Sequence, residues 1–404
     1  MVDPNPPSVF RSHPDIDETV IARASAFVPE LRERSQEIHA LGRIPADLFE
    51  RIDAAGLVKL SAPRSHGGFE ADMKTRHATL VELGRGDLSV GWILALMNNA
   101  SWALHALYPK AVADALVATP GGFRAGATGS PSAKVRKAAG GYMIEEGQWG
   151  FNSGIYHASW DALAIPLVDE AGTVIDHGFA FVPVEAITIL NDWDTAGLRG
   201  TGSSSIRVRD VFVPEERVAP LSKILSGEIQ GAIATAPVFR ASVLPLLSVT
   251  EFSPVLGAAQ TALDILLERL PGRTVHGSNE MKSESPVIHL QIGEISAKID
   301  AANLLIQRAA DDIDRNAQAG TEQMQLLDRA RIRRDIGFAA RLVAEAVDNA
   351  AVIYGASAAA VSNPMGRVWR DIRTATLHGL LAAPPSLEIY GRLRCGQPPK
   401  QAMY

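Results

Sequence analysis

The sequence predicts a mostly helical α+β fold, in which a small β domain lies between two helical domains. Residues 140–218 are rich in glycine and β-branched residues and cannot form long helices, whereas apolar residues recur at helical spacing on both sides. With 404 residues, the chain is too long for one small core. We expect an N-terminal helical domain at residues 1–120, a central β domain at 121–225 and a C-terminal four-helix bundle at 226–404.

The first domain is predicted to be entirely helical. Apolar residues at helical spacing predict one helix over residues 19–39, and Pro45 starts a second helix that stops at Gly56. The Pro120-Gly121-Gly122 break closes the domain. Three further helices are expected before this break, at residues 72–83, 87–107 and 109–117.

The central region is predicted to consist of strands. Gly140-Gly141 forms a hairpin turn between residues 134–138 and 142–146, and a second turn lies at 169–172. Apolar residues alternate most clearly in the last β-prone run, which favours a barrel or sandwich with one solvent-facing side. The other β-prone runs are 162–168, 178–184 and 206–213.

Long helical patterns return after residue 225. They cover residues 237–270, 286–319 and 321–362, and Pro364 starts a last major helix to Ala382. Long helices joined by short turns predict a four-helix bundle.

Composition excludes several classes of protein. The net charge of −6, with scattered Lys and Arg residues, argues against nucleic acid as a partner. Cys395 is the only cysteine and the ten histidines show no ligand spacing, so we expect no disulfide within the chain, no metal site and a reducing, cytoplasmic location. The N-terminus lacks a signal-peptide pattern, and the most apolar window, residues 89–107, contains polar residues that make it a buried helix and not a membrane span.

Three short motifs carry the functional information. They are Trp149-Gly150-Phe151-Asn152-Ser153-Gly154, then Gly197-Leu198-Arg199-Gly200-Thr201-Gly202-Ser203, then Arg370-Asp371-Ile372-Arg373 followed by His378. The order of the three domains resembles the acyl-CoA dehydrogenase fold over nearly the whole chain. The residues of the three motifs are similar to those of its oxygen-activating branch, the two-component flavin-dependent monooxygenases. The resemblance implies reduced FMN or FAD (FMNH2 or FADH2), O2, a separate NAD(P)H-dependent flavin reductase and a homotetramer made of two dimers.

His378 is the candidate proton acceptor. Dehydrogenases of this fold carry an Arg-Asp pair followed by a Glu-Gly that supplies the base, and here His378-Gly379 stands in that place. Some carry the glutamate on an earlier helix, where our alignment puts Leu247. Without that carboxylate the chain is expected to be a poor dehydrogenase, while histidine suits a proton relay to a phenol, indole or amine. The alternative is a helix histidine bonded to a neighbour.

The first motif is the candidate flavin segment. In relatives this segment runs beside the flavin ring, which implies that Trp149, Phe151, Asn152 and Ser153 contact it. A Ser153 hydroxyl bonded to flavin N5 would lengthen the life of an oxygenated flavin, because one such bond contributes about 1 kcal/mol. The alternatives are a turn serine and a Trp149 packed in the β domain.

A second group of flavin contacts is implied for the C-terminal half. Arg273-Thr274-Val275-His276-Gly277 is similar to the Arg-x-x-Phe-Gly motif of the dehydrogenases, whose arginine reaches the flavin phosphate across a subunit boundary. Ser278 adds a donor, and the turn with Gly355 and Ser357 lies where relatives pass the flavin tail. An exposed loop arginine is the alternative.

The helix over residues 87–107 is expected to border the substrate. Its candidates are Trp92, Asn98, Asn99, Trp102 and His105, and His378 is expected to line the same pocket, although both tryptophans equally suit a core. Phenol hydroxylases of this branch often have a histidine just before the tryptophan that Trp102 matches, and this chain does not. His157 is expected to be structural.

The resemblance therefore implies hydroxylation of an aromatic or heteroaromatic molecule, such as an indole, a fused polyketide ring or a phenol-like compound, through a C4a-hydroperoxyflavin. N- or S-oxygenation is the alternative within the family. An FAD-dependent acyl-CoA dehydrogenase with a base not identified in the sequence, and a catalytically idle flavin-binding scaffold, are the alternatives outside it.

Overall fold

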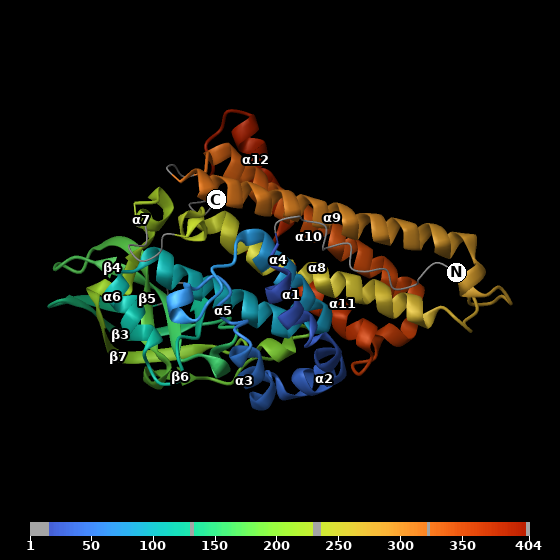
Figure 1. Cartoon of the computed structure of the whole chain (residues 1–404), viewed down its shortest axis with the longest axis horizontal. Helices are drawn as coiled ribbons and strands as arrows, with labels where there is room; N and C mark the ends of the chain where they lie inside the picture. The colour runs from blue at the N-terminus through green and yellow to red at the C-terminus, as the bar shows by residue number, and fades with distance from the viewer. Residues whose placement is uncertain (1–15, 130–132, 229–235, 321–323, 401–404) are drawn as a thin grey trace.

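A computed structural model describes residues 16–129, 133–228, 236–320 and 324–400. It has the predicted order of helices, strands and helices, with the β strands at one end of an elongated molecule and the long helices extending to the other (Figure 1). Within this described part of the chain, no helix is long and apolar enough to cross a membrane.

From residue 16 onward, six α-helices precede the first strand. They are α1 (Glu18–Ser25), α2 (Val28–Leu41), α3 (Ala46–Ala54), α4 (Met73–Gly86), α5 (Leu88–Leu107) and α6 (Lys110–Val117). The single helix predicted for residues 19–39 is wrong, because the chain turns at Ala26 and Phe27. Pro29 explains the break, since its ring lacks an N–H and clashes with the carbonyl four residues earlier in a continuous helix.

The strands form two four-stranded sheets, which confirms the predicted strand-rich centre and its hairpin at Gly140-Gly141. One sheet has the order β1-β4-β5-β8 and the other β2-β3-β7-β6. Their apolar inner faces enclose a core that includes Ile144, Trp149 and Ile206. The strands are β1 (Ala125–Thr128), β2 (Ala133–Ala138), β3 (Gly141–Trp149), β4 (Trp160–Val168), β5 (Val174–Pro183), β6 (Ile187–Ile189), β7 (Ile206–Pro214) and β8 (Val218–Pro220).

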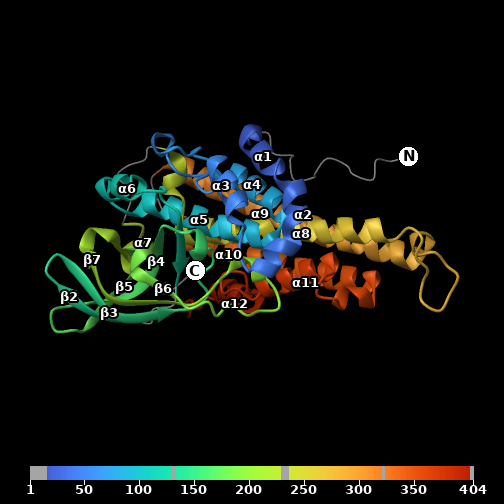
Figure 2. The ribbon, with the colours of Figure 1, turned by 90° about the horizontal axis from the view of Figure 1, so that it is seen from below.

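Most of the C-terminal helices pack as a bundle along the long axis of the molecule (Figure 2). After the short α7 (Leu221–Ser226), they are α8 (Val243–Arg269), α9 (Pro286–Ala319), α10 (Leu326–Tyr354), α11 (Pro364–Ala375) and α12 (Ala383–Arg394). The bounds predicted for α9 are confirmed, while α8 begins six residues late, after a short 3-10 turn over Pro237–Arg240. Part of the helix predicted over 321–362 lies outside the described residues, and the rest ends at Tyr354.

The last predicted helix, 364–382, is wrong at its C-terminal end. Helix α11 stops at Ala375, a turn follows, and α12 begins at Ala383. The guanidinium of Arg333 on α10 donates hydrogen bonds to the carbonyls of Gly379 and Leu380. These carbonyls are therefore paired outside a helix, and the turn that contains His378 is held against α10.

Candidate functional site

Helix α5 runs between the candidate catalytic turn and the candidate flavin segment. Trp92 on α5 meets His378 edge-to-face, with ring centroids 5.4 Å apart. The next residue, Ile93, and Met97 face Gly154 of the candidate flavin segment. A Cβ added to Gly154 would lie 3.0 Å from Ile93 and 3.2 Å from Met97. One helix thus presents adjacent faces to the two motifs.

His378 lies in the turn after α11, not on a helix as its sequence position had indicated. Its Nδ1 lies 3.1 Å from Oε2 of Glu251 on α8, closer than the backbone N–H of Leu380 at 3.4 Å. A neutral ring with its hydrogen on Nδ1 would point that hydrogen at Glu251 and keep the Nε2 lone pair available to accept a proton from a ligand. Because 41% of the His378 side chain is exposed, a substrate can reach it.

Glu251 is the functional candidate that the sequence reasoning missed. It is buried, and its charge and hydrogen bond raise the pKa of His378 even though burial alone lowers that pKa. The alignment had put Leu247 at the alternative position of the dehydrogenase base, and Glu251 lies one helical turn further along the same helix. It could have been found, since it is the only charged residue between positions 243 and 263 of an otherwise apolar helix.

The negative charge of Glu251 is compensated inside the protein. Asn99 on α5 donates to Oε1 of Glu251 at 3.4 Å and accepts from the buried guanidinium of Arg76 on α4. Burial lowers the pKa of Arg76 to about 9, and the charge of Glu251 acts in the opposite direction. Arg76 therefore stays protonated at neutral pH and places a buried positive charge near the Glu251 side chain.

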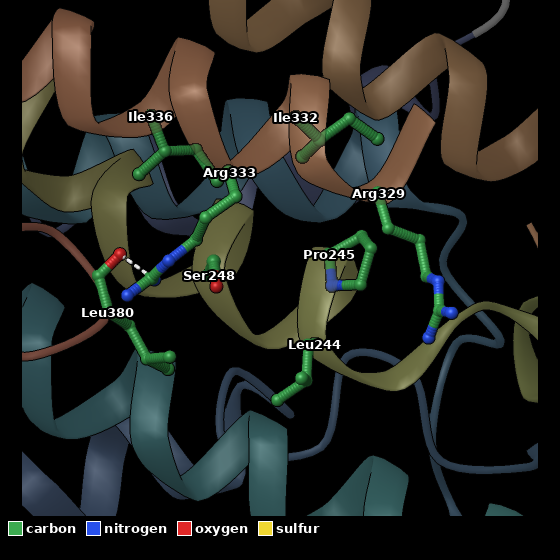
Figure 3. Close-up of a pocket in the computed structure, with 8 residues that line it drawn as sticks. All are labelled: Leu244, Pro245, Ser248, Arg329, Ile332, Arg333, Ile336 and Leu380. Carbon is green, nitrogen blue, oxygen red and sulfur yellow. Dashed lines mark hydrogen bonds between the residues drawn. The ribbon is translucent and has the colours of Figure 1, made fainter. Parts of the chain in front are cut away.

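A narrow pocket lies behind the His378 turn (Figure 3). Arg333 points across it to the carbonyl of Leu380, and Ser248 lies beside them. Its free volume of about 10 Å³ is at the lower limit for a single water molecule, so it supports the turn and does not hold a substrate.

Two of the predicted pocket residues on α5 have other partners. Asn98 donates to the carbonyls of Leu57 and Leu94 and accepts from the N–H of Leu60, which occupies its whole amide group. Trp102 is fully buried and donates to the carbonyl of Val238 at 2.8 Å. The structure therefore brings Trp92 and Asn99 toward His378, and directs Asn98 and Trp102 into the core.

The remaining face of α5 borders a separate cavity of about 130 Å³. His105 lies there, with Nε2 3.0 Å from Nδ1 of His66, whose Nε2 is 3.1 Å from Asp114. Burial lowers the pKa of His105 to about 4, so this ring is neutral at pH 7. His157 stacks on Phe49 with ring centroids 4.3 Å apart, in agreement with a structural role.

The first motif is mostly buried, and Phe151 is its exposed member. Trp149 is buried in the β core and donates to the carbonyl of Ala164, and Asn152 donates to the buried carboxylate of Asp161. Phe151 has a positive φ of 59° and is 78% exposed. Ser153 is buried, and its hydroxyl lies 2.6 Å from that of Ser203 in the second motif.

The second and third motifs are joined directly. The carboxylate of Asp371 on α11 accepts a hydrogen bond of 2.6 Å from the N–H of Leu198. Gly197 packs so closely on this helix that an added Cβ would lie 2.2 Å from the carbonyl of Arg370. Burial raises the pKa of Asp371 to about 7. The loop that contacts Ser153 is therefore anchored on the helix that leads to His378.

The predicted phosphate-binding residues lie at the far end of the bundle from the β domain (Figure 1). Arg273 is exposed in the loop between α8 and α9, which also contains Ser278. Near this loop, Lys282 donates to the last turn of α10, and Arg269 lies 3.5 Å from the hydroxyl of Ser357, two residues after Gly355. These residues form one group at this end of the bundle.

The segment at Phe151–Ser153 has the chemistry that a flavin ring requires. The exposed Phe151 ring offers an apolar surface, and no described residue accepts a hydrogen bond from the backbone N–H of Phe151 or Asn152. The pyrimidine edge of a flavin carries carbonyl oxygens that need such donors. The residues present therefore fit the ring of a flavin, and the group around Arg273 suits its phosphate.

Comparison with known proteins supports this description. Residues 15–108 match the family model "Acyl-CoA dehydrogenase, N-terminal domain" and residues 250–382 match "Acyl-CoA dehydrogenase, C-terminal domain". The chain is 30% identical to the flavin-dependent monooxygenase oxygenase subunit HsaA of Rhodococcus jostii (strain RHA1), covering 93% of this chain and 98% of that protein.

Two further relatives are similar over most of their length. The oxygenase component of an FADH2-dependent resorcinol hydroxylase from Rhizobium sp. (strain MTP-10005) is 27% identical, over 89% of this chain and 90% of that protein. The solved structure of XiaF from Streptomyces sp. in complex with FADH2 and glycerol superposes with a TM-score of 0.89 at 28% identity, covering 96% of this chain and 97% of that one.

Proposed function

Because the chain belongs to the acyl-CoA dehydrogenase-like oxygenase components of two-component flavin-dependent monooxygenases, we propose that it hydroxylates an aromatic or heteroaromatic small molecule. The observation that carries this proposal is the ion pair between His378 and the buried Glu251, beside the Trp92 ring. Relatives over nearly their whole length are a flavin-dependent monooxygenase and a resorcinol hydroxylase, which supports an aromatic substrate.

Reduced FMN or FAD, supplied by a separate reductase, would provide two electrons and activate O2 for transfer of one oxygen atom. Phe151 would orient the ring through its exposed side chain and its backbone N–H group, and Ser153 would contact its central edge. In this fold the Arg273 group of one chain would reach the phosphate of a flavin held by a partner, since the loop between α8 and α9 lies at the end of the bundle away from the β domain (Figure 1). This arrangement calls for a dimer at least, and a tetramer of two dimers fits it.

His378 would accept the proton that the substrate loses. A phenol hydroxyl or ring N–H that gives its proton to Nε2 becomes electron-rich at carbon, which favours attack on an electrophilic oxygen. Glu251 would stabilise the resulting imidazolium through Nδ1, as the buried carboxylate of a catalytic triad orients its histidine and stabilises the protonated ring. Trp92 would provide an apolar wall for the aromatic substrate.

The presence of Glu251 also gives a reason to test the dehydrogenase alternative. A carboxylate does lie on the earlier helix, so the lack of a base in the sequence no longer argues against that chemistry. The contact with His378 does, because a buried carboxylate that faces the imidazole is poorly placed to reach a substrate carbon. N- or S-oxygenation would use the same residues, with a heteroatom as the acceptor of oxygen.

One experiment separates these functions. The protein is mixed anaerobically with photoreduced FMN or FAD, then with ¹⁸O2 and a panel of phenols and indoles, and products are analysed by mass spectrometry. We expect one ¹⁸O atom in a hydroxylated product. If no substrate in the panel gains ¹⁸O and the flavin is reoxidised at the rate of free flavin, the proposal is contradicted. Anaerobic bleaching of oxidised FAD by an acyl-CoA would instead establish a dehydrogenase.

A further inference from the structure

A row of three buried hydroxyl groups ends at Ser153. The Ser153 hydroxyl lies 2.6 Å from that of Ser203, which lies 2.6 Å from that of Thr201, which lies 2.7 Å from the carbonyl of Leu198. The three side chains are at most 5% exposed. This row, which we call the hydroxyl relay, links the second sequence motif to the candidate flavin segment.

The carbonyl at the end of the hydroxyl relay fixes the direction of every hydrogen bond in it. A carbonyl oxygen only accepts, so Thr201 donates its single hydroxyl hydrogen to Leu198. Ser203 must then donate to Thr201, because Thr201 has no second hydrogen. For the same reason Ser153 must donate to Ser203. The Ser153 hydrogen is thereby used, and its oxygen presents only lone pairs to its surroundings.

The start of the relay is itself held in place. Leu198 adopts a positive φ of 54°, and its N–H donates to Asp371. Its carbonyl also accepts hydrogen bonds from the backbone N–H of Thr201 at 3.1 Å and from Nε1 of Trp193 at 3.0 Å. A carbonyl with these anchors cannot turn away, so the relay cannot reverse without breaking a buried hydrogen bond.

We propose that the hydroxyl relay makes Ser153 a hydrogen-bond acceptor toward the central ring nitrogen of the flavin, and thereby selects the reduced cofactor. This inference rests on the proposed function. The N5 atom of a reduced flavin carries a hydrogen, which an acceptor hydroxyl matches, whereas N5 of an oxidised flavin has a lone pair that faces the lone pairs of Ser153. Such a contact suits an enzyme that must take up reduced flavin and release the oxidised form.

The test is an equilibrium measurement that requires no turnover. Dissociation constants for oxidised and reduced FMN and FAD are measured anaerobically by flavin fluorescence and ultrafiltration, and selectivity is the ratio of the oxidised to the reduced constant. Ser203→Ala frees the Ser153 hydrogen to donate to oxidised N5. We expect its selectivity to fall about five-fold, the effect of one neutral hydrogen bond.

Two matched pairs make the result specific. Thr201→Val should lower the selectivity as Ser203→Ala does, while Thr201→Ser keeps the hydroxyl and should restore it. Ser204→Ala lies in the same loop, where its hydroxyl bonds Tyr156 outside the relay, and should leave selectivity unchanged. Circular dichroism of each variant reports folding.

The outcomes are distinct. A wild-type protein that binds both redox forms equally, or a Ser203→Ala variant with unchanged selectivity, would overturn the relay while leaving the proposed function intact. A folded protein that binds neither form of either flavin would overturn the proposed function itself.

Discussion

Removal of the Glu251 charge should lower the pKa of His378 by about one unit. The change Glu251→Gln keeps the shape of the side chain and removes the negative charge that lies 3.1 Å from Nδ1. A hydrogen bond to a charged group contributes about 1.5–3 kcal/mol. The lower end applies here, because 41% of the His378 side chain is exposed and water screens the pair. At 1.36 kcal/mol per pKa unit, this corresponds to about one unit.

The assay is the pH dependence of product formation, with the pKa of His378 measured in parallel by NMR on histidine-labelled protein. A base must be neutral to accept a proton, so activity rises with pH through the pKa of His378. In Glu251→Gln this acid limb should move about one pH unit lower, and the plateau should fall about ten-fold because the imidazolium is less stabilised. Glu82→Gln makes the same change in a buried carboxylate on α4 and should not move the limb. An unmoved limb in Glu251→Gln, or an equal shift in Glu82→Gln, would refute the reasoning.

Three further predictions follow from the site. His378→Ala should reduce hydroxylated product about 10²-fold or more while flavin oxidation continues with release of H2O2; an unchanged product yield, measured by chromatography, would remove His378 from the mechanism. Arg273→Ala should weaken reduced-flavin binding by titration, and co-expression with Ser153→Ala chains should restore some activity, because a mixed dimer has one intact site; no recovery in purified mixed dimers would argue against a shared site. Asn98→Leu should lower the free energy of unfolding by about 2–4 kcal/mol in urea, since it leaves the N–H of Leu60 unpaired, and a smaller loss would show that the amide is not structural.

The pattern of the sequence predicted the order of the elements well, because it depends on periodicity that is local. Helix ends were less predictable, since they depend on partners far away in the chain. Helix α11 stops before His378 where Arg333 from α10 binds the carbonyls of the turn, and no local signal at residues 375–382 encodes that contact.

The candidate site shows the same division. Residue types alone could not tell which of Asn98 and Asn99 is structural. The two side chains point about 100° apart around α5, so Asn98 binds backbone carbonyls and Asn99 approaches Glu251. Glu251 was missed because the alignment on α8 stopped one turn short. Thr201 and Ser203 were noted as parts of a motif, but their order as hydrogen-bond donors appears only when the carbonyl of Leu198 is in place.

The bond between Leu198 and Asp371 has a consequence for biosynthesis. These residues are 173 positions apart, so the loop beside Ser153 acquires its anchor only when α11 has left the ribosome and packed. Contacts of this separation form late, because they close long loops of chain. The β domain can therefore fold while its flavin contacts are still incomplete. A truncated product without α11 would lack this anchor for the loop beside Ser153.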